Sequence, residues 1–191
     1  VIATIGAVVG LITYTRNLAK ELGVSENTAK QFRGEIALAG TELARFGQSA
    51  KTIASELVEA FGTTERISQN TIVEIGKAAT KLGAETKDII SIQKQLMDMT
   101  GASADASMEL INNIGRLSAA EGVGAGNVIA DIASNMATFA EFSTMGAQGL
   151  AEAAVQAAKV GSSLENVTAF AGKLIDFESS ITAEFEAQVL T

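Results

Sequence analysis

The chain contains no cysteine, histidine, tryptophan or proline among its 191 residues. Without cysteine it forms neither a disulfide nor a thiolate metal site, and without histidine it lacks the commonest general base and metal ligand. The absence of proline indicates long helical stretches, because proline interrupts the hydrogen-bond ladder of a helix. Aromatic residues make up only 5% of the chain, so we expect helices that approach closely through small and aliphatic side chains.

Positive charge is also scarce, since 14 lysines and arginines face 22 acidic residues and give a net charge of -8. A chain with this balance has no general attraction for a phosphate backbone. We therefore expect no specific nucleic-acid binding.

The longest regular pattern is an apolar stripe from Ala29 to Ala60, in which the spacing alternates between three and four residues. This period predicts one long helix, roughly 48 Å in length at 1.5 Å per residue, that packs lengthwise against another helix. Gly40 and Gly47 flank the stripe, where we expect them to admit a close neighbour. The stripe predicts a helix-packing or oligomer seam formed by Phe32, Ile36, Leu43, Phe46, Ile53 and Leu57.

Glycines then punctuate the chain at intervals near 20 residues, each close to a hydroxyl, amide or acidic side chain. Glycine adopts the left-handed conformation that ends a helix, and the side chains that follow are typical helix caps. The junctions begin at Gly62, Gly83, Gly101, Gly122 and Gly161. They predict a series of short helices, and 122–126 is expected to be the loosest junction. No window alternates with the period of a strand.

These patterns predict an all-α chain, with one long heptad-patterned helix followed by shorter helices in a coiled-coil-like or helical-bundle oligomer. We divide it into an apolar glycine-containing segment (1–15), a long amphipathic helix region (16–61) and two helical arrays (62–126 and 127–191). The last helix is expected to add a second packing seam, formed by Phe170, Leu174, Phe177, Ile181 and Phe185.

The first fourteen residues carry no charge and contain Gly6 and Gly10, the small-xxx-small spacing of closely packed helices in lipid. Fourteen residues are too few to span a bilayer, which needs about 20. The segment is therefore interpreted as a buried helix in an assembly, as a membrane-active helix, or as a signal peptide.

No group of residues suggests a reaction centre. Ser49 with Lys51, and Ser91 with Lys94, place a hydroxyl near an amine, but neither pair has supporting motifs. The glycines of 122–126 lack the lysine and the preceding strand of a phosphate-binding loop. We expect a protein that is not an enzyme and has no catalytic, cofactor-binding or metal-binding residues.

The stretch from Ala153 to Thr191 contains a distinctive helix junction. One helix is expected to end in Lys159-Val160-Gly161, and the next to begin with Ser163-Leu164-Glu165-Asn166-Val167. Asp176-Phe177-Glu178-Ser179-Ser180 follows, with Glu184, Glu186 and Gln188 beyond it. This stretch resembles the tape measure proteins of tailed bacteriophages. Because the first residue is valine, we expect the sequence to be part of a longer polypeptide.

The resemblance implies a structural protein of the virion, made in the host cytoplasm, that fills the lumen of the tail tube and sets tail length. Such proteins dock on the baseplate or tip hub in several copies, commonly three, and leave the tube ahead of the DNA. Some members insert into host membranes, which 1–14 would do here. The alternative is a membrane-inserting helical translocator or pore-forming protein.

Overall fold

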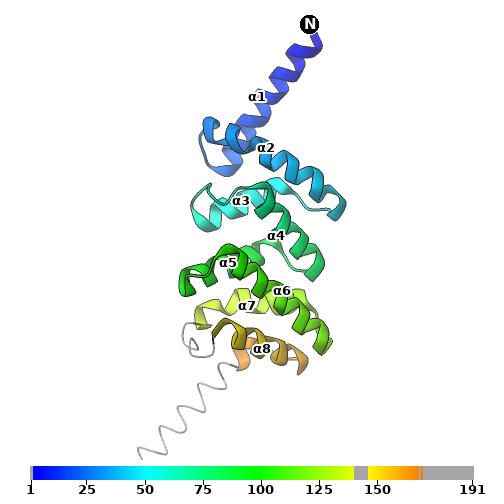
Figure 1. Ribbon diagram of the computed structural model, residues 1–191, viewed down its shortest axis with the longest axis vertical. Helices are drawn as coiled ribbons and strands as arrows, with labels where there is room; N and C mark the ends of the chain where they lie inside the picture. The colour runs from blue at the N-terminus through cyan, green and yellow to red at the C-terminus, as the bar shows by residue number, and fades with distance from the viewer. Residues whose placement is uncertain (1, 140–145, 168, 170–191) are drawn as a thin grey trace, which may run out of the picture. The chain divides into compact units, whose positions relative to one another are not determined.

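The computed structural model describes residues 2–139, 146–167 and 169, which form helices and no strand (Figure 1). This confirms the prediction of an all-α chain. The elements are α1 (Ile2–Leu22), α2 (Glu26–Leu43), the 3-10 helix η1 (Ala44–Phe46), α3 (Ala50–Phe61), α4 (Gln69–Leu82), α5 (Thr86–Thr100), α6 (Ala104–Glu121), α7 (Ala125–Phe139) and α8 (Gly146–Lys159). Residues 164–167 are also helical.

The glycine junctions end helices as predicted. All five predicted glycines have φ near +70°, the left-handed conformation that a glycine adopts with little strain. Serine side chains cap five of the helices that follow a break, since each accepts a hydrogen bond from a backbone N–H three residues on. They are Ser25, Ser49, Ser68, Ser103 and Ser163. After Gly62, however, the cap is Ser68, and the threonines next to the glycine lie in the connection.

The prediction of one long helix from Ala29 to Ala60 was wrong, because the stripe is divided between α2 and α3. Gly47, with φ of 68°, ends η1 in the left-handed conformation. Ser49 then caps α3 by accepting a hydrogen bond from Thr52 N at 3.3 Å. Gly47 therefore breaks the helix and does not line a close contact, whereas a β-carbon at position 40 would lie 3.8 Å from Ala50 Cβ, an ordinary contact distance.

The junction at 122–126 is shorter than predicted. Gly122 takes φ of 72°, and Val123 N donates to Ser118 O at 2.9 Å, which closes the end of α6. The next helix, α7, already begins at Ala125 and includes Gly126. Only 122–124 lie outside helices, so this junction resembles the others.

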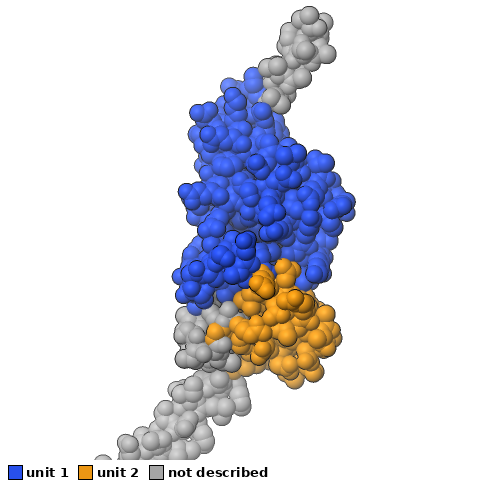
Figure 2. Space-filling view, viewed as in Figure 1, with its two compact units in different colours: residues 1–108 blue, residues 109–191 orange. Residues whose placement is uncertain are grey.

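The chain divides into two compact units, residues 1–108 and 109–191 (Figure 2). Among the described residues of unit 1 the core is aliphatic, with leucine or isoleucine from each of α1 to α5, and no aromatic side chain is fully buried. Its largest fully buried members are Leu18, Leu43, Ile53, Leu57, Ile72, Ile75, Ile89, Ile90, Ile92 and Leu96.

The helices of unit 1 pack in two rows. Each helix packs against its neighbours in the chain. In addition, α1 packs against α3, α2 packs against α4, and α3 packs against α5. Odd-numbered helices thus form one row and even-numbered helices the other, as in helical-repeat proteins. The sequence did not predict this arrangement, because the helices differ in length and their spacing is irregular.

Unit 2 contains α7 packed against α8. Its buried side chains include Ile114, Ile129, Ile132, Val155 and Leu164. Polar contacts also join α6 to α8: Asn113 Nδ2 donates to Gln148 Oε1 at 2.9 Å, and Lys159 pairs with Glu121 at 2.5 Å. The relation of a helix to the second helix after it therefore recurs in this unit.

Candidate functional surfaces

Polar contacts within each unit join several helices to the second helix after them, across 30 to 38 residues of sequence: α1 to α3, α2 to α4, α3 to α5, α6 to α8, and α7 to the helical residues that begin at Leu164. Most of these contacts use a carboxylate on the earlier helix. Three of them reach the first residue of the later helix: Glu35 to Gln69, Glu56 to Thr86, and Asp131 to Leu164. A carboxylate at this place satisfies donors at the helix start and is favoured by the helix dipole.

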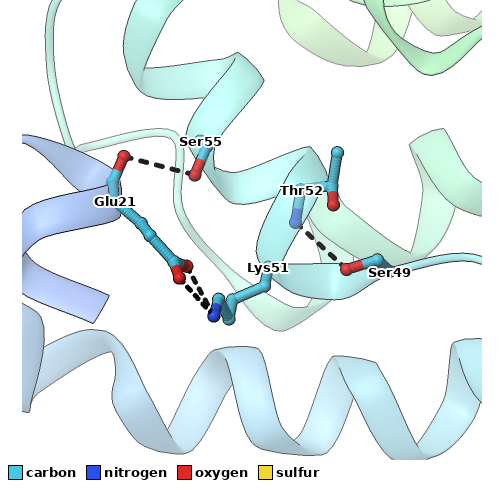
Figure 3. A network of polar contacts seen from close by, with 5 residues as sticks. All are labelled: Glu21, Ser49, Lys51, Thr52 and Ser55. Carbon is cyan, nitrogen blue, oxygen red and sulfur yellow. Dashed lines mark hydrogen bonds and ion pairs between the residues drawn. The ribbon is translucent and has the colours of Figure 1, made fainter. Parts of the chain in front are cut away.

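Figure 3 shows the contacts that join α1 to α3. Lys51 lies 2.6 Å from the carboxylate of Glu21, and Ser55 Oγ donates to the backbone oxygen of Glu21 at 3.5 Å. Ser49 Oγ accepts from Thr52 N and thereby caps α3. The sequence places the Ser49 hydroxyl near the Lys51 amine, and in the structure the serine caps a helix and the lysine forms an ion pair.

The second serine–lysine pair is explained in the same way. Lys94 forms an ion pair with Asp98 on the same helix. Ser91 Oγ accepts from Gln95 Nε2 at 3.5 Å. Within the described residues, each lysine of these two pairs forms an ion pair with a carboxylate of the same chain.

A groove of about 490 Å³ lies between α2 and the first half of α4. Its walls carry Glu35, Glu42, Ser68, Gln69, Asn70, Val73, Glu74 and Lys77. Glu35 Oε2 accepts from Gln69 N at 2.9 Å, and Asn70 Nδ2 donates to Glu74 Oε1 at 3.1 Å. The hydrogen bond from Lys77, 2.5 Å away, lowers the pKa of Glu42.

The carboxylates of the groove are bound to groups of the same chain, so its polar side chains connect α2 to α4. No three acidic side chains within the described residues are arranged to hold a metal ion. The arrangement can fix the position of α4 on α2, and it offers no pairing of a base with a nucleophile.

At the start of α5 two acidic side chains, Glu85 and Asp88, lie close enough for their charges to repel each other. Glu85 occupies the N-cap position but makes no side-chain cap bond, since its carboxylate pairs with Lys87 at 2.8 Å. An acid at the N-cap position therefore does not cap α5 with its side chain. Burial, together with the charge of Glu85, raises the pKa of Asp88. Hydrogen bonding to Glu85 raises the pKa of Lys87.

The predicted seam residues divide into two groups. Ile36, Leu43, Ile53 and Leu57 are each at most 2% exposed within a single chain, whereas Phe32 and Phe46 are half-buried. Helices of the same unit cover the first group, so no second copy is needed to bury these four side chains. An oligomer that uses the two phenylalanines stays a prediction.

The remaining predicted positions are the C-terminal seam and the two glycines of the first segment. The C-terminal seam of Phe170, Leu174, Phe177, Ile181 and Phe185 lies outside the described residues. Gly6 and Gly10 lie within α1. Among the helices that the structure describes, none has both the length and the apolar character needed to cross a membrane.

Sequence reasoning missed Gly76, which lies on α4 beneath Leu43 and Ile53. It also missed the carboxylates that reach the starts of later helices. A recurrent acid about 30 to 35 residues before a helix start, as at Glu35, Glu56 and Asp131, was the available signal. One such acid carries little information alone, since acidic residues are common on any helix surface.

Comparisons with known proteins found no matching family model, curated protein or solved structure. The functional interpretation therefore depends on the described geometry and on the resemblance at Ala153–Thr191.

Proposed function

We propose that this chain is a structural segment of a phage tail tape measure protein. In this proposal it fills part of the lumen of the tail tube, contributes to tail length, and docks with copies of itself on the baseplate or tip hub. It leaves the tube before the DNA. The contacts of the described residues suit such a role, because they hold helices together and assemble no reaction centre.

The observation that carries the proposal is the helix junction in the stretch of resemblance. Gly161 has φ of 70° after Lys159 and Val160. Ser163 Oγ accepts from Asn166 N at 3.2 Å, and Asp131 holds the N–H of Leu164. The Lys-apolar-Gly ending and the Ser-x-Glu-x-Val start, which are the features shared with that family, thus coincide with a helix end and a capped helix start.

The fold changes what the proposal says about length. Residues 26–61 form two helices packed on one another, so this stretch is shorter than one continuous helix of the same residues. We therefore propose that the chain is a folded section of the tape measure protein, in which helix packing sets the length per residue.

The experiment is an in-frame deletion of residues 69–100, which removes α4 and α5, in the gene that encodes the protein. Electron microscopy of many particles measures tail length. We expect shorter tails, with a loss that stays below the roughly 48 Å that 32 residues would span as one helix. A second gene with these residues duplicated serves as the matched control and should give longer tails. Tails of unchanged length in both would reject the proposal.

A further inference from the structure

The side of α2 that faces away from the core carries a row of residues at intervals of four. Neighbouring members of such a row lie one helical turn apart on the same face. The row, which we call the α2 row, consists of Lys30, Gly34, Leu38 and Glu42. The first three are exposed and Glu42 is half-buried, so the α2 row is accessible from outside the chain.

The middle of the α2 row combines an exposed leucine with an open glycine. Leu38 is 56% exposed, and a β-carbon at position 34 would meet no atom within 4 Å. A single exposed leucine is common on protein surfaces and does not by itself indicate a binding surface. The order of the four residues carries the argument.

The α2 row is complementary to itself when its direction is reversed. A second α2 helix running antiparallel would bring Leu38 of one copy over Gly34 of the other, and Lys30 of one copy beside Glu42 of the other. Each contact would occur twice, because a two-fold axis exchanges the two copies. The opposite charges at the two ends would fix this register, since a parallel arrangement would place like charges together.

The chain already uses the central contact between two of its own helices. Leu43 of α2 lies over Gly76 of α4, where a β-carbon would come within 2.7 Å of Leu43 Cδ2. Glycine thus lets a leucine of a neighbouring helix approach closely. Because Leu38 and Gly34 lie on one helix and are both open, two copies of that helix complete the same contact twice.

The charged ends of the α2 row are available for such a pairing. Within the described part of the chain, Lys30 forms no ion pair. Glu42 pairs with Lys77 through Oε1, and 33% of its side chain remains exposed. A lysine of a second copy can therefore approach the Glu42 carboxylate.

We propose that the α2 row is an interaction surface for a second copy of this chain, bound through a two-fold antiparallel contact between the two α2 helices. One helix from each copy buries little surface compared with the roughly 1,200–2,000 Å² of stable interfaces. We therefore expect a weak pair, with a dissociation constant in the micromolar to millimolar range. This inference does not depend on the proposed function, because it is tested by association in solution and not by tail length.

Sedimentation equilibrium of the 191-residue chain measures the dissociation constant. Leu38→Gln should weaken the pair at least about tenfold, as for a central apolar contact. Val160→Gln is the matched control, since Val160 is 76% exposed but lies on α8; it should leave the constant within about twofold. A parent chain that stays monomeric at millimolar concentration, or equal constants for the parent and Leu38→Gln, would overturn the proposal.

The charges of the α2 row are tested at constant net charge. Lys30→Glu places an acid opposite Glu42 of the other copy and should weaken the pair about threefold or more. Lys20→Glu makes the same change of net charge at an exposed position of α1 and should have less effect. Equal effects of the two variants would contradict the antiparallel register.

Disulfide trapping tests the register directly, because the chain has no cysteine of its own. Gly34→Cys and Leu38→Cys chains, mixed and oxidised, should form a linked pair at least about tenfold faster than Gly34→Cys mixed with Glu59→Cys. Glu59 is exposed on α3 and lies outside the α2 row. Circular dichroism checks that each variant is folded. Equal rates of linkage in the two mixtures would overturn the proposal.

Discussion

Leu43 of α2 packs directly over the Cα atom of Gly76 in α4: a β-carbon at position 76 would lie 2.7 Å from Leu43 Cδ2 and 2.9 Å from Cδ1. Ile53 Cδ1 of α3 would lie 3.2 Å away. Carbon atoms do not approach so closely without displacement, so glycine at this position lets three helices meet. The contact joins the two halves of the stripe that the sequence suggested was one helix.

Gly76→Ala is therefore expected to destabilise the chain by about 1–3 kcal/mol, the usual cost of overpacking a core. The measurement is the free energy of unfolding in urea. Gly34→Ala is the matched control, since Gly34 lies in a helix with no atom near its missing β-carbon; that variant should stabilise by up to about 1 kcal/mol. If both variants were equally stable, the packing described for Leu43 would be incorrect.

Asp131→Ala should destabilise unit 2 by about 1–2 kcal/mol, because it removes the acceptor for Leu164 N at the start of a helix. Asp131→Asn keeps an acceptor oxygen and should cost less. Urea unfolding followed by circular dichroism gives both values. A loss with asparagine as large as that with alanine would show that charge matters more than the hydrogen bond.

Ser118→Ala is expected to be neutral or stabilising. The Ser118 side chain is fully buried, and its hydroxyl has no hydrogen-bond partner within the described part of the chain. Burying a hydroxyl without a partner costs free energy that alanine does not incur. Ser107→Ala is the control, since Ser107 is equally buried but donates to Ser103 O at 2.9 Å. The thermal midpoint should fall for Ser107→Ala only.

Two carboxylates should give opposite dependences on pH. Glu42 has a lowered pKa in the folded chain, so its stabilising contribution is present at neutral pH and is lost as the pH falls below about 4. Asp88 has a raised pKa, so its charge destabilises the fold at neutral pH, and protonation relieves this as the pH falls.

Glu42→Gln should therefore be less stable than the parent at pH 7, and Asp88→Asn more stable. Both differences should shrink as the pH approaches 3. Urea unfolding across this range is the measurement, with the parent chain as reference at each pH. Differences that persist unchanged at low pH would assign the effects to packing instead of charge.

Local signals in the sequence predicted local structure well. A glycine followed by a serine or an acid predicted most helix ends, because left-handed glycine and capping serine act within a few residues. Gly47 and Ser49 carry the same signal of a helix end, but the apolar stripe continues past them and predicted one unbroken helix. That stripe continues because Leu43 and Ile53 pack on the same glycine of α4, although they lie on different helices.

The pairing of each helix with the second one after it could not be predicted in this way. It depends on contacts such as Glu35 with Gln69, whose partners are 34 residues apart. Neither residue has a distinctive identity, and a single sequence does not show which distant residues meet. The half-buried Phe32 and Phe46 illustrate the same limit, since periodicity placed them with the core, whereas neighbouring helices cover them only in part.

The two rows of helices in unit 1 impose a parity rule on changes in chain length. Inserting one helix would move every later helix into the opposite row, and carboxylates such as Glu56 would then face the wrong helix starts. Inserting or removing two helices would return each later helix to its own row. Lengthened or shortened forms of this chain should therefore differ by even numbers of helices.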